Sequence, residues 1–169
     1  MKNIKSLSFG VLLSVLFFTS CIKDNSEIRT YNDEMVELNE LIQTLIADGY
    51  DVDTTASGVY YIIHEAGEGD FAKIGDTVSI NYEGYLSDGS MFDDSDDWST
   101  DGVWEFVYGE QSLISGFNEA LSLMNTNMEA EFIISSDLAY GASGYGYIGS
   151  FQTLIFGVKM IEIKPVSNE

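Results

Sequence analysis

The stretch LAYGASG, residues 138–144, places Tyr140 among very small side chains, between a strand-like segment and a loop of glycines and tyrosines. Glycine and alanine let backbones approach closely, and they leave a tyrosine hydroxyl free to donate to one specific partner. Other chemistry is sparse: His64 is the only histidine, and we expect it to end a strand without a chemical role. The sequence shows no metal-ligand cluster, no Ser/His/Asp set and no phosphate-binding loop. A positioned tyrosine hydroxyl is therefore the first candidate functional group.

The acidic run DDSDDW, residues 93–98, has oxygen ligands of the kind that calcium prefers. The run lacks the ligand spacing and the distal glutamate of a known calcium loop. We therefore expect a solvated acidic loop, and the sequence leaves calcium binding open.

The charge balance narrows the partners of this chain. It has 28 acidic residues against 7 basic ones, a net charge of −21 at pH 7. Such a chain does not bind nucleic-acid phosphates or anionic headgroups through a basic patch, so we expect no nucleic-acid partner. The hydrophobic content of 45% is enough for a packed core, and the acid excess keeps the surface solvated.

The first twenty residues have the pattern of a secretory signal. Lys2 and Lys5 precede an apolar run, residues 7–18, that is too short to span a bilayer as a mature helix. Cys21, the only cysteine, follows Thr19 and Ser20 in a context that resembles a bacterial lipobox, which implies lipidation of Cys21. The alternative is a free thiol near an ordinary cleavage site. We expect an exported protein, anchored by lipid to the bacterial cell envelope at the outer membrane. The KDNSE that follows resembles acidic signals of Bacteroidetes surface lipoproteins.

The pattern divides the chain into four parts. We assign residues 1–20 to the signal peptide, 21–31 to a tether, 32–56 to a helical extension and 57–165 to the main domain. The extension shows apolar residues at three-and-four spacing from Asn32 to Asp48, with Asn32 as the cap and Gly49 at the end. A short helix with one apolar stripe must pack on something. We favour the following domain, and the alternative is a second copy, which would make a homodimer.

In the main domain, apolar and polar residues alternate with a period of two. We expect strands at 59–64, 77–86, 103–108, 129–135 and 153–163, with a hairpin turn at 87–90 leading into Met91 and Phe92. One short helix carries Phe117, Ala120, Leu121 and Met124 on a single face. Antiparallel strands with one helix indicate an α+β domain whose curved sheet wraps that helix.

Four segments together resemble the FKBP-type peptidyl-prolyl cis–trans isomerases: YEGYLSDGSMFDDS, WEFVYGEQSLISGFNEALSLM, SDLAYGASG and TLIFGVKMIEI. The match runs in order from about residue 57 to 165. The resemblance implies a five- or six-stranded antiparallel half-barrel around one helix, here with an extra N-terminal helix. It implies no cofactor and no metal, and its substrates are proline-containing polypeptides, here exported proteins during folding.

The resemblance also assigns residues to a pocket. It implies that the hydroxyl of Tyr140 and the amide of Ile114 bind substrate carbonyls, and that Asp93 stands beside aromatic walls formed by Tyr82 and Phe92. An acid directly after Phe92 is hard to explain by packing, because a buried carboxylate needs partners. The further substrate-binding residues implied are Trp104, Phe106, Leu113, Phe117, Tyr145 and Phe156. The alternative for the aromatic residues is an ordinary place in the core, with tyrosine hydroxyls satisfied by backbone.

The sequence departs from the family pattern at the pocket. Ser115 stands where active members often have arginine, Phe117 replaces a tryptophan, and the loop after Tyr140 is shorter and has no proline. Two functions therefore stay open: a prolyl isomerase, which the retained pocket residues favour, and a non-catalytic FKBP-like module that binds peptide or another ligand.

Overall fold

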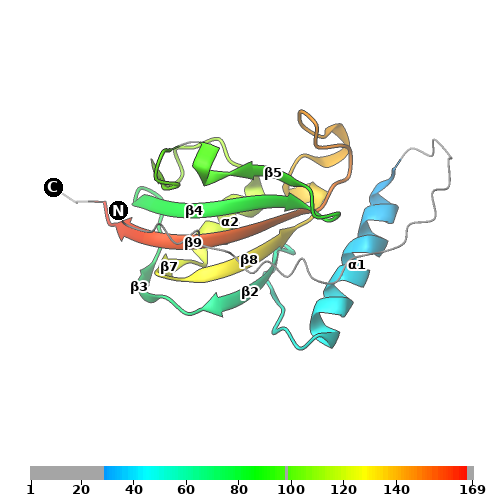
Figure 1. The fold of residues 1–169 in the computed structure, drawn as a ribbon, viewed down its shortest axis with the longest axis horizontal. Helices are drawn as coiled ribbons and strands as arrows, with labels where there is room; N and C mark the ends of the chain where they lie inside the picture. The colour runs from blue at the N-terminus through cyan, green and yellow to red at the C-terminus, as the bar shows by residue number, and fades with distance from the viewer. Residues whose placement is uncertain (1–28, 98, 167–169) are drawn as a thin grey trace, which may run out of the picture.

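The structure is a computed structural model that describes residues 29–97 and 99–166, in which a curved antiparallel sheet lies between two helices (Figure 1). The helices are α1 (Tyr31–Ala47) and α2 (Ser115–Ser122). The strands are β1 (Asp53–Thr54), β2 (Tyr60–Glu65), β3 (Glu68–Phe71), β4 (Thr77–Leu86), β5 (Met91–Asp94), β6 (Trp104–Val107), β7 (Asn125–Thr126), β8 (Glu129–Ile134) and β9 (Leu154–Lys164). Three 3-10 turns complete the described elements: η1 (Ser95–Asp97), η2 (Ser136–Leu138) and η3 (Gly141–Ser143).

The main sheet has seven strands in the order β1-β2-β8-β9-β4-β5, and β6 pairs with the first half of β4. All of its pairings are antiparallel. This is the predicted α+β arrangement, and the strands expected at 59–64, 77–86, 103–108, 129–135 and 153–163 correspond to β2, β4, β6, β8 and β9 within one or two residues. The sequence did not indicate β1, or the small sheet formed by β3 and β7, because strands of two to four residues are too short for an alternation to be recognised.

Helix α2 packs against the concave face of the sheet. On β4, Val78, Ile80 and Tyr82 point into this core, as the period of two predicts. Gly116 allows the close approach of the helix, because a Cβ atom there would lie 2.3 Å from a methyl carbon of Ile134 on β8. The next residue, Phe117, is consequently brought to the middle of the concave face.

Helix α1 begins one residue earlier than expected, and a different residue caps it. Thr30 is the N-cap: its hydroxyl accepts from the amide of Asp33, whose carboxylate accepts in turn from the amide of Thr30. Asn32, the predicted cap, lies inside the helix, because a threonine three residues before an acidic residue forms the reciprocal capping box. Gly49, with a φ of +93°, follows the C-terminal end as predicted.

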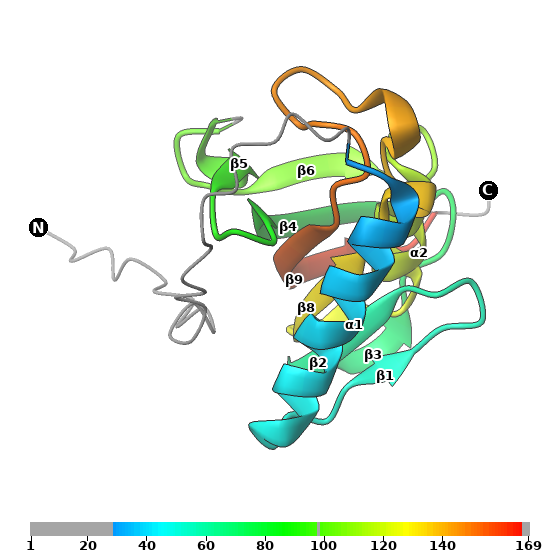
Figure 2. The ribbon, with the colours of Figure 1, turned by 90° about the vertical axis from the view of Figure 1, so that its right-hand side faces the viewer.

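The apolar stripe of α1 packs on the outer face of the sheet (Figure 2). Leu38, Ile42 and Leu45 form one cluster with Ile62 of β2 and Ile133 of β8. The neighbours of Ile133 along β8 face the other way, into the α2 core. The predicted packing of the extension on its own domain is therefore what the structure has.

His64 lies on β2, directly before the last residue of the strand, which confirms its predicted place at a strand end. Its Nε2 atom is 3.8 Å from a carboxylate oxygen of Glu131 on the neighbouring strand β8. The nearby carboxylate of Glu131 raises the pKa of His64 above its ordinary value, against the opposing effect of burial.

The predicted signal peptide and Cys21 lie outside the described residues, so the lipid anchor stays a prediction, as do the boundaries after residues 20, 31 and 56. Neither helix within the ranges 29–97 and 99–166 combines the length and the apolarity that a transmembrane helix needs.

The packing of α1 predicts a stability loss that depends on the face of the helix. We expect Ile42→Ala to lower the free energy of unfolding by about 2–4 kcal/mol, because Ile42 is buried against the sheet. Val36→Ala, on the exposed side of the same helix, should change it by less than about 0.5 kcal/mol. Urea denaturation followed by circular dichroism measures both. Equal losses in the two variants would contradict the observed packing.

Candidate functional site

A cavity of about 420 Å³ opens on the α2 side of the sheet. Strands β4, β5, β6 and β9, the turn before α2, α2 itself and the loop between β8 and β9 all contribute to it. Its lining residues are Tyr82, Phe92, Asp93, Trp104, Gln111, Ser112, Leu113, Ile114, Phe117, Tyr140, Tyr145 and Phe156. The cavity is therefore built from segments spread over some seventy positions of the chain, and only the fold brings them together.

Aromatic rings form the walls and floor, with Tyr82 at their centre. The Tyr82 ring centroid lies 5.7 Å from Trp104, 5.8 Å from Phe117 and 6.4 Å from Phe156. Phe156 in turn lies 4.7 Å from Phe117 and meets Phe92 edge to face at 5.4 Å. Such tilted and T-shaped contacts are the favoured geometries of aromatic pairs, so the rings hold one another in place.

Gly84 makes room for two of these rings. It lies on β4 two residues after Tyr82 and points to the same face of the sheet. A Cβ atom there would lie 2.8 Å from the Phe92 ring and 3.2 Å from the Phe156 ring. The rings of Phe92 and Phe156 can therefore pack this closely only because residue 84 has no side chain.

One carboxylate lies in this aromatic setting. The hydroxyl of Tyr82 donates to Oδ2 of Asp93 at 2.9 Å, and the amide of Tyr82 donates to the hydroxyl of Ser95 at 3.1 Å. A carboxylate beside apolar walls is costly unless it is hydrogen-bonded. The Tyr82–Asp93 bond thus allows an acid at the cavity and fixes the central ring at the same time.

Two residues of the cavity lining carry a donor that has no acceptor in the described part of the chain. The hydroxyl of Tyr140 has no hydrogen-bond partner among these residues, and the same holds for the amide of Ile114 at the N-terminal end of α2. Burial raises the pKa of Tyr140, and the proximity of Tyr145 and Asp93 raises it further, so its hydroxyl keeps its proton at neutral pH. The Tyr145 ring stacks on Tyr140 at 5.0 Å, which limits the positions that the phenol can take.

The structure brings together ten of the eleven pocket residues expected from the sequence. Phe106 is the exception: it is buried behind the cavity wall, with its ring 4.1 Å from that of Trp104, because both side chains leave β6 on the same face and Trp104 lies in front. Phe106 therefore supports the wall and does not line it. The individual roles of the ten lining residues stay predictions.

Gln111 and Ser112 also line the cavity, although no sequence pattern predicted this. They precede Leu113 and Ile114 in the turn between β6 and α2. The one signal in the sequence was their position directly before Leu113 and Ile114, which were predicted to line the pocket. This signal was weak, because polar residues in a turn are normally solvated. They add polar groups to the rim.

The acidic run 93–98 divides between two environments. Asp93 faces the cavity, whereas Asp96 and Asp97 are exposed in the η1 turn, where the amide of Asp97 donates to the carboxylate of Asp94 at 3.0 Å. Within residues 29–97 and 99–166, no group of three or more acidic, histidine or cysteine side chains is arranged to hold a metal ion.

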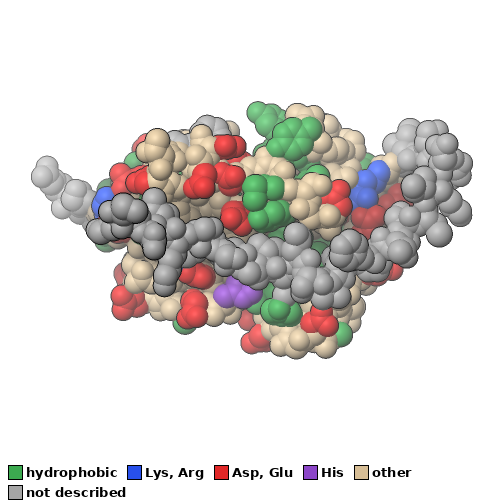
Figure 3. Space-filling model, in the orientation of Figure 1, with side chains coloured by type: hydrophobic (Ala, Val, Ile, Leu, Met, Phe, Trp, Pro, Cys, Tyr) green, Lys and Arg blue, Asp and Glu red, His purple; other side chains and the backbone are tan. Residues whose placement is uncertain are grey.

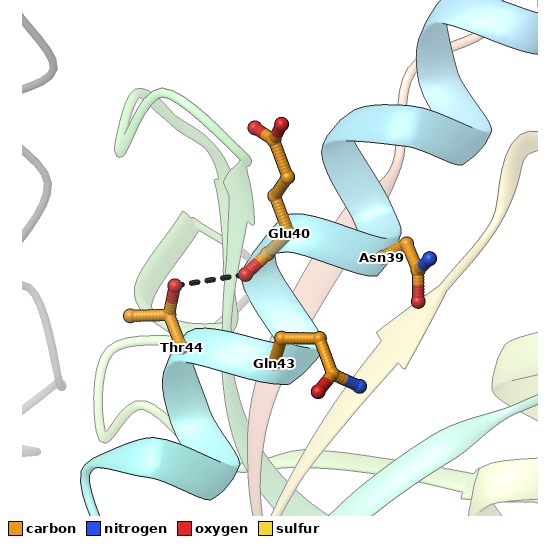
Figure 4. A pocket seen from close by; sticks show the side chains of 4 residues that line it. All are labelled: Asn39, Glu40, Gln43 and Thr44. Atoms are coloured by element: carbon orange, nitrogen blue, oxygen red, sulfur yellow. Dashed lines mark hydrogen bonds between the residues drawn. The ribbon is translucent and has the colours of Figure 1, made fainter.

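A second hollow lies on the exposed side of α1 and is lined by four polar residues. Figure 4 shows Asn39, Glu40, Gln43 and Thr44 projecting from neighbouring turns, with the Thr44 hydroxyl donating to the carbonyl of Glu40 at 2.8 Å. One helix supplies every lining side chain, so this is a shallow groove of the helix surface rather than an enclosed site.

Acidic side chains are spread over the face of the molecule shown in Figure 3. Each of the four basic residues in the described ranges pairs with a carboxylate: Arg29 with Glu37, Lys73 with Asp70, Lys159 with Glu129, and Lys164 with Glu105 and Glu162. The remaining carboxylates give the molecule a negative potential that favours cationic over anionic ligands.

The arrangement suits binding of a small apolar ring whose flanking carbonyl oxygens need donors. The rings of Tyr82, Phe117 and Phe156 supply an apolar surface, and Tyr140 and Ile114 supply a hydroxyl and an amide hydrogen. This is the geometry expected of a site that recognises proline within a peptide chain.

Comparison with known proteins agrees with this geometry. Residues 68–161 match the family model of the FKBP-type peptidyl-prolyl cis-trans isomerases. A probable FKBP-type peptidyl-prolyl cis-trans isomerase of Haemophilus influenzae is 36% identical over 124 residues, which cover 73% of this chain and 50% of the relative. The Escherichia coli isomerase FkpA is 33% identical over 68% of this chain and 41% of its own length. This chain thus spans about half the length of the curated relatives it matches, or less.

Solved structures show the same likeness. The crystal structure of FkpA from Escherichia coli superposes with a TM-score of 0.69 and 31% identity, covering 81% of this chain and 62% of that one. The crystal structure of a peptidyl-prolyl cis-trans isomerase from Pseudomonas syringae gives 0.67 and 29%, covering 83% of this chain and 100% of that one.

The position of Gly84 generates a prediction about the cavity. We expect Gly84→Ala to displace the Phe92 and Phe156 rings and to cost about 1–3 kcal/mol of folding stability by overpacking. Near-ultraviolet circular dichroism should report the changed aromatic environment. Gly149→Ala is the matched control, because its Cβ atom would meet other atoms only at 3.8 Å or more. An unchanged aromatic spectrum in Gly84→Ala would contradict the close packing described here.

Proposed function

This chain belongs to the FKBP-type peptidyl-prolyl cis-trans isomerases, and on that basis we propose that it catalyses cis–trans isomerisation of peptide bonds that precede proline. The observation that carries the proposal is the pairing of an aromatic cavity with two hydrogen-bond donors, Tyr140 and Ile114, that have no acceptor among the described residues. The substrates are proline-containing polypeptides, for which we propose exported proteins during folding.

The reaction needs rotation about one bond and no bond breaking. Amide resonance sets a barrier of about 18–20 kcal/mol, and an uncatalysed prolyl bond takes tens of seconds or longer to isomerise. In the twisted amide the conjugation is lost, so the carbonyl becomes more ketone-like and electron density returns to nitrogen. An apolar environment therefore favours the twisted state over the more polar planar states.

Each part of the cavity has a place in this mechanism. The pyrrolidine ring rests against Phe117, between the walls formed by Tyr82 and Phe156. The hydroxyl of Tyr140 and the amide of Ile114 hold carbonyl oxygens on the two sides of the ring, which orients the segment and favours the twisted geometry. Asp93 fixes Tyr82 through the 2.9 Å hydrogen bond and keeps the central wall in position.

The second candidate is a binding module that uses the same cavity without turnover. The floor residue favours it: Phe117 is smaller than the tryptophan of many family members and has no indole N–H. The two functions make different predictions, because a module would bind a proline peptide and leave its rate of isomerisation at the uncatalysed value.

A chymotrypsin-coupled assay on a proline peptide tests the proposal. We expect wild type to accelerate isomerisation, and Tyr140→Phe to lower kcat/KM about two- to tenfold through loss of one hydrogen bond. Asp93→Val should lower it about tenfold or more, since it leaves the Tyr82 hydroxyl at the cavity without this acceptor. Tyr50→Phe, at the α1 cluster on the other face, should leave the rate unchanged. A wild-type rate equal to the uncatalysed one, with peptide binding retained, would favour the binding module.

We further propose that the protein is exported and anchored by lipid on Cys21 to the cell envelope, at the outer membrane. The support is the sequence alone: a basic start, a short apolar run and a cysteine after small residues. Pairing of two copies through α1 remains a hypothesis beside it. Such pairing would use the side of α1 that faces away from the sheet, where Val36 and Ile46 are 51% and 48% exposed. Sedimentation of the full chain in detergent measures the oligomeric state.

Metabolic labelling tests the anchor. Cells that express the full chain should incorporate a palmitate analogue into the protein, and Cys21→Ser should abolish the label because no other cysteine is present. Absence of label on the wild-type protein would remove the anchor from the proposal.

A further inference from the structure

Glu34 in the first turn of α1 is completely buried, although it lies in the N-terminal extension, outside the residues that match the family model. An acid in the first turn of a helix is usually solvated and interacts with the helix dipole. A carboxylate with no exposed surface is retained only where donors satisfy it. The contacts of Glu34 therefore indicate a specific task.

Those contacts join the two ends of the loop between β8 and β9. The amide of Ser136, just after β8, donates to Oε1 of Glu34 at 2.7 Å, and the Ser136 hydroxyl donates to Oε2. The hydroxyl of Thr153, just before β9, donates to Oε1 at 2.9 Å. Ser136 and Thr153 are themselves buried. One side chain of the extension thus fixes the place where the loop leaves the sheet and the place where it returns.

The residues next to α1 reach the same loop. Arg29 donates from Nε to the carbonyl of Phe151 at 2.9 Å, and the Tyr31 ring meets the Phe151 ring at 6.4 Å. Figure 2 shows the N-terminal end of α1 beside this loop. The extension therefore holds the loop at several points, of which Glu34 is the buried one.

The loop needs such support because it is rich in glycine and because it carries residues that line the cavity. It carries Tyr140 and Tyr145 into the cavity, yet it contains four glycines within nine residues, at 141, 144, 146 and 149. Glycine gives the backbone conformational freedom that weakens the placement of a neighbouring side chain. Tyr140 is only four residues from Ser136. A shift of the backbone at Ser136 would therefore also displace the Tyr140 phenol.

We propose that Glu34 is a positioning residue for the cavity: by fixing both ends of the β8–β9 loop, it directs the Tyr140 hydroxyl toward the bound peptide. The proposal rests on the prolyl isomerase function where the effect of Glu34 is measured as a rate of isomerisation. It gives the N-terminal extension a part in the reaction itself, in addition to any part in anchoring.

A double-mutant cycle on the full chain in mild detergent tests the proposal in turnover. We expect Glu34→Ala to lower kcat about two- to fivefold, no more than Tyr140→Phe does, with KM within about twofold, since the apolar walls that bind the ring are unchanged. Glu34→Gln, which keeps one acceptor oxygen, should recover most of the loss. In a Tyr140→Phe background Glu34→Ala should have little further effect, because it acts through the hydroxyl already removed. Equal fold-losses in both backgrounds would overturn the proposal.

Hydrogen exchange by mass spectrometry tests the same claim without any activity. Glu34→Ala should increase the exchange rates of amides in residues 136–153 about tenfold or more, while those of β4 and α2 stay as in wild type. Glu40→Ala is the matched control: an exposed glutamate on the same helix, directed away from the domain (Figure 4). Unchanged exchange in the loop, or equally faster exchange in β4, would overturn the proposal. A wild-type protein without isomerase activity would instead contradict the proposed function and leave this result valid.

Discussion

The hydrogen bond between Tyr82 and Asp93 is the constraint on which the cavity depends. Tyr82 comes from the long strand β4 and Asp93 from the neighbouring edge strand β5, and the register of the two strands sets Asp93 opposite Gly84. The hydroxyl of Tyr82 can therefore reach the carboxylate at 2.9 Å, while Gly84 leaves the space that the rings of Phe92 and Phe156 occupy. A polar pair of this kind lets an aromatic cavity stay open, because its central ring is held by a directional bond and not by packing alone.

Much of this arrangement could be predicted from the sequence, because it follows from local periodicity. The alternation in β4 places Tyr82 and Gly84 on the inner face, and three-and-four spacing identifies both helices. Periodicity does not say how far along a strand a cavity extends. Trp104 and Phe106 share a face of β6, and only the packing of the whole domain decides that Trp104 lines the cavity while Phe106 lies behind it.

Glu34 shows what sequence reasoning could not reach. An acid in the first turn of a helix is normally solvated and interacts with the helix dipole, and Asp33, the neighbour of Glu34, is such an exposed acid. The burial of Glu34 depends on Ser136 and Thr153, which lie 102 and 119 positions away along the chain. Contacts of this separation leave no local pattern. The extension and the β8–β9 loop consequently appear in the sequence as two unrelated segments, and in the structure as one unit beside the cavity.

The central claim is that the aromatic cavity holds a proline ring while Tyr140 binds a carbonyl next to it. A crystal structure of the protein with a proline-containing peptide is the most direct measurement. We expect the pyrrolidine ring to lie against Phe117, enclosed by Tyr82 and Phe156, with a peptide carbonyl within hydrogen-bond distance of the Tyr140 hydroxyl. A peptide bound elsewhere on the molecule, or a proline ring outside the cavity with the Tyr140 hydroxyl turned away, would contradict it.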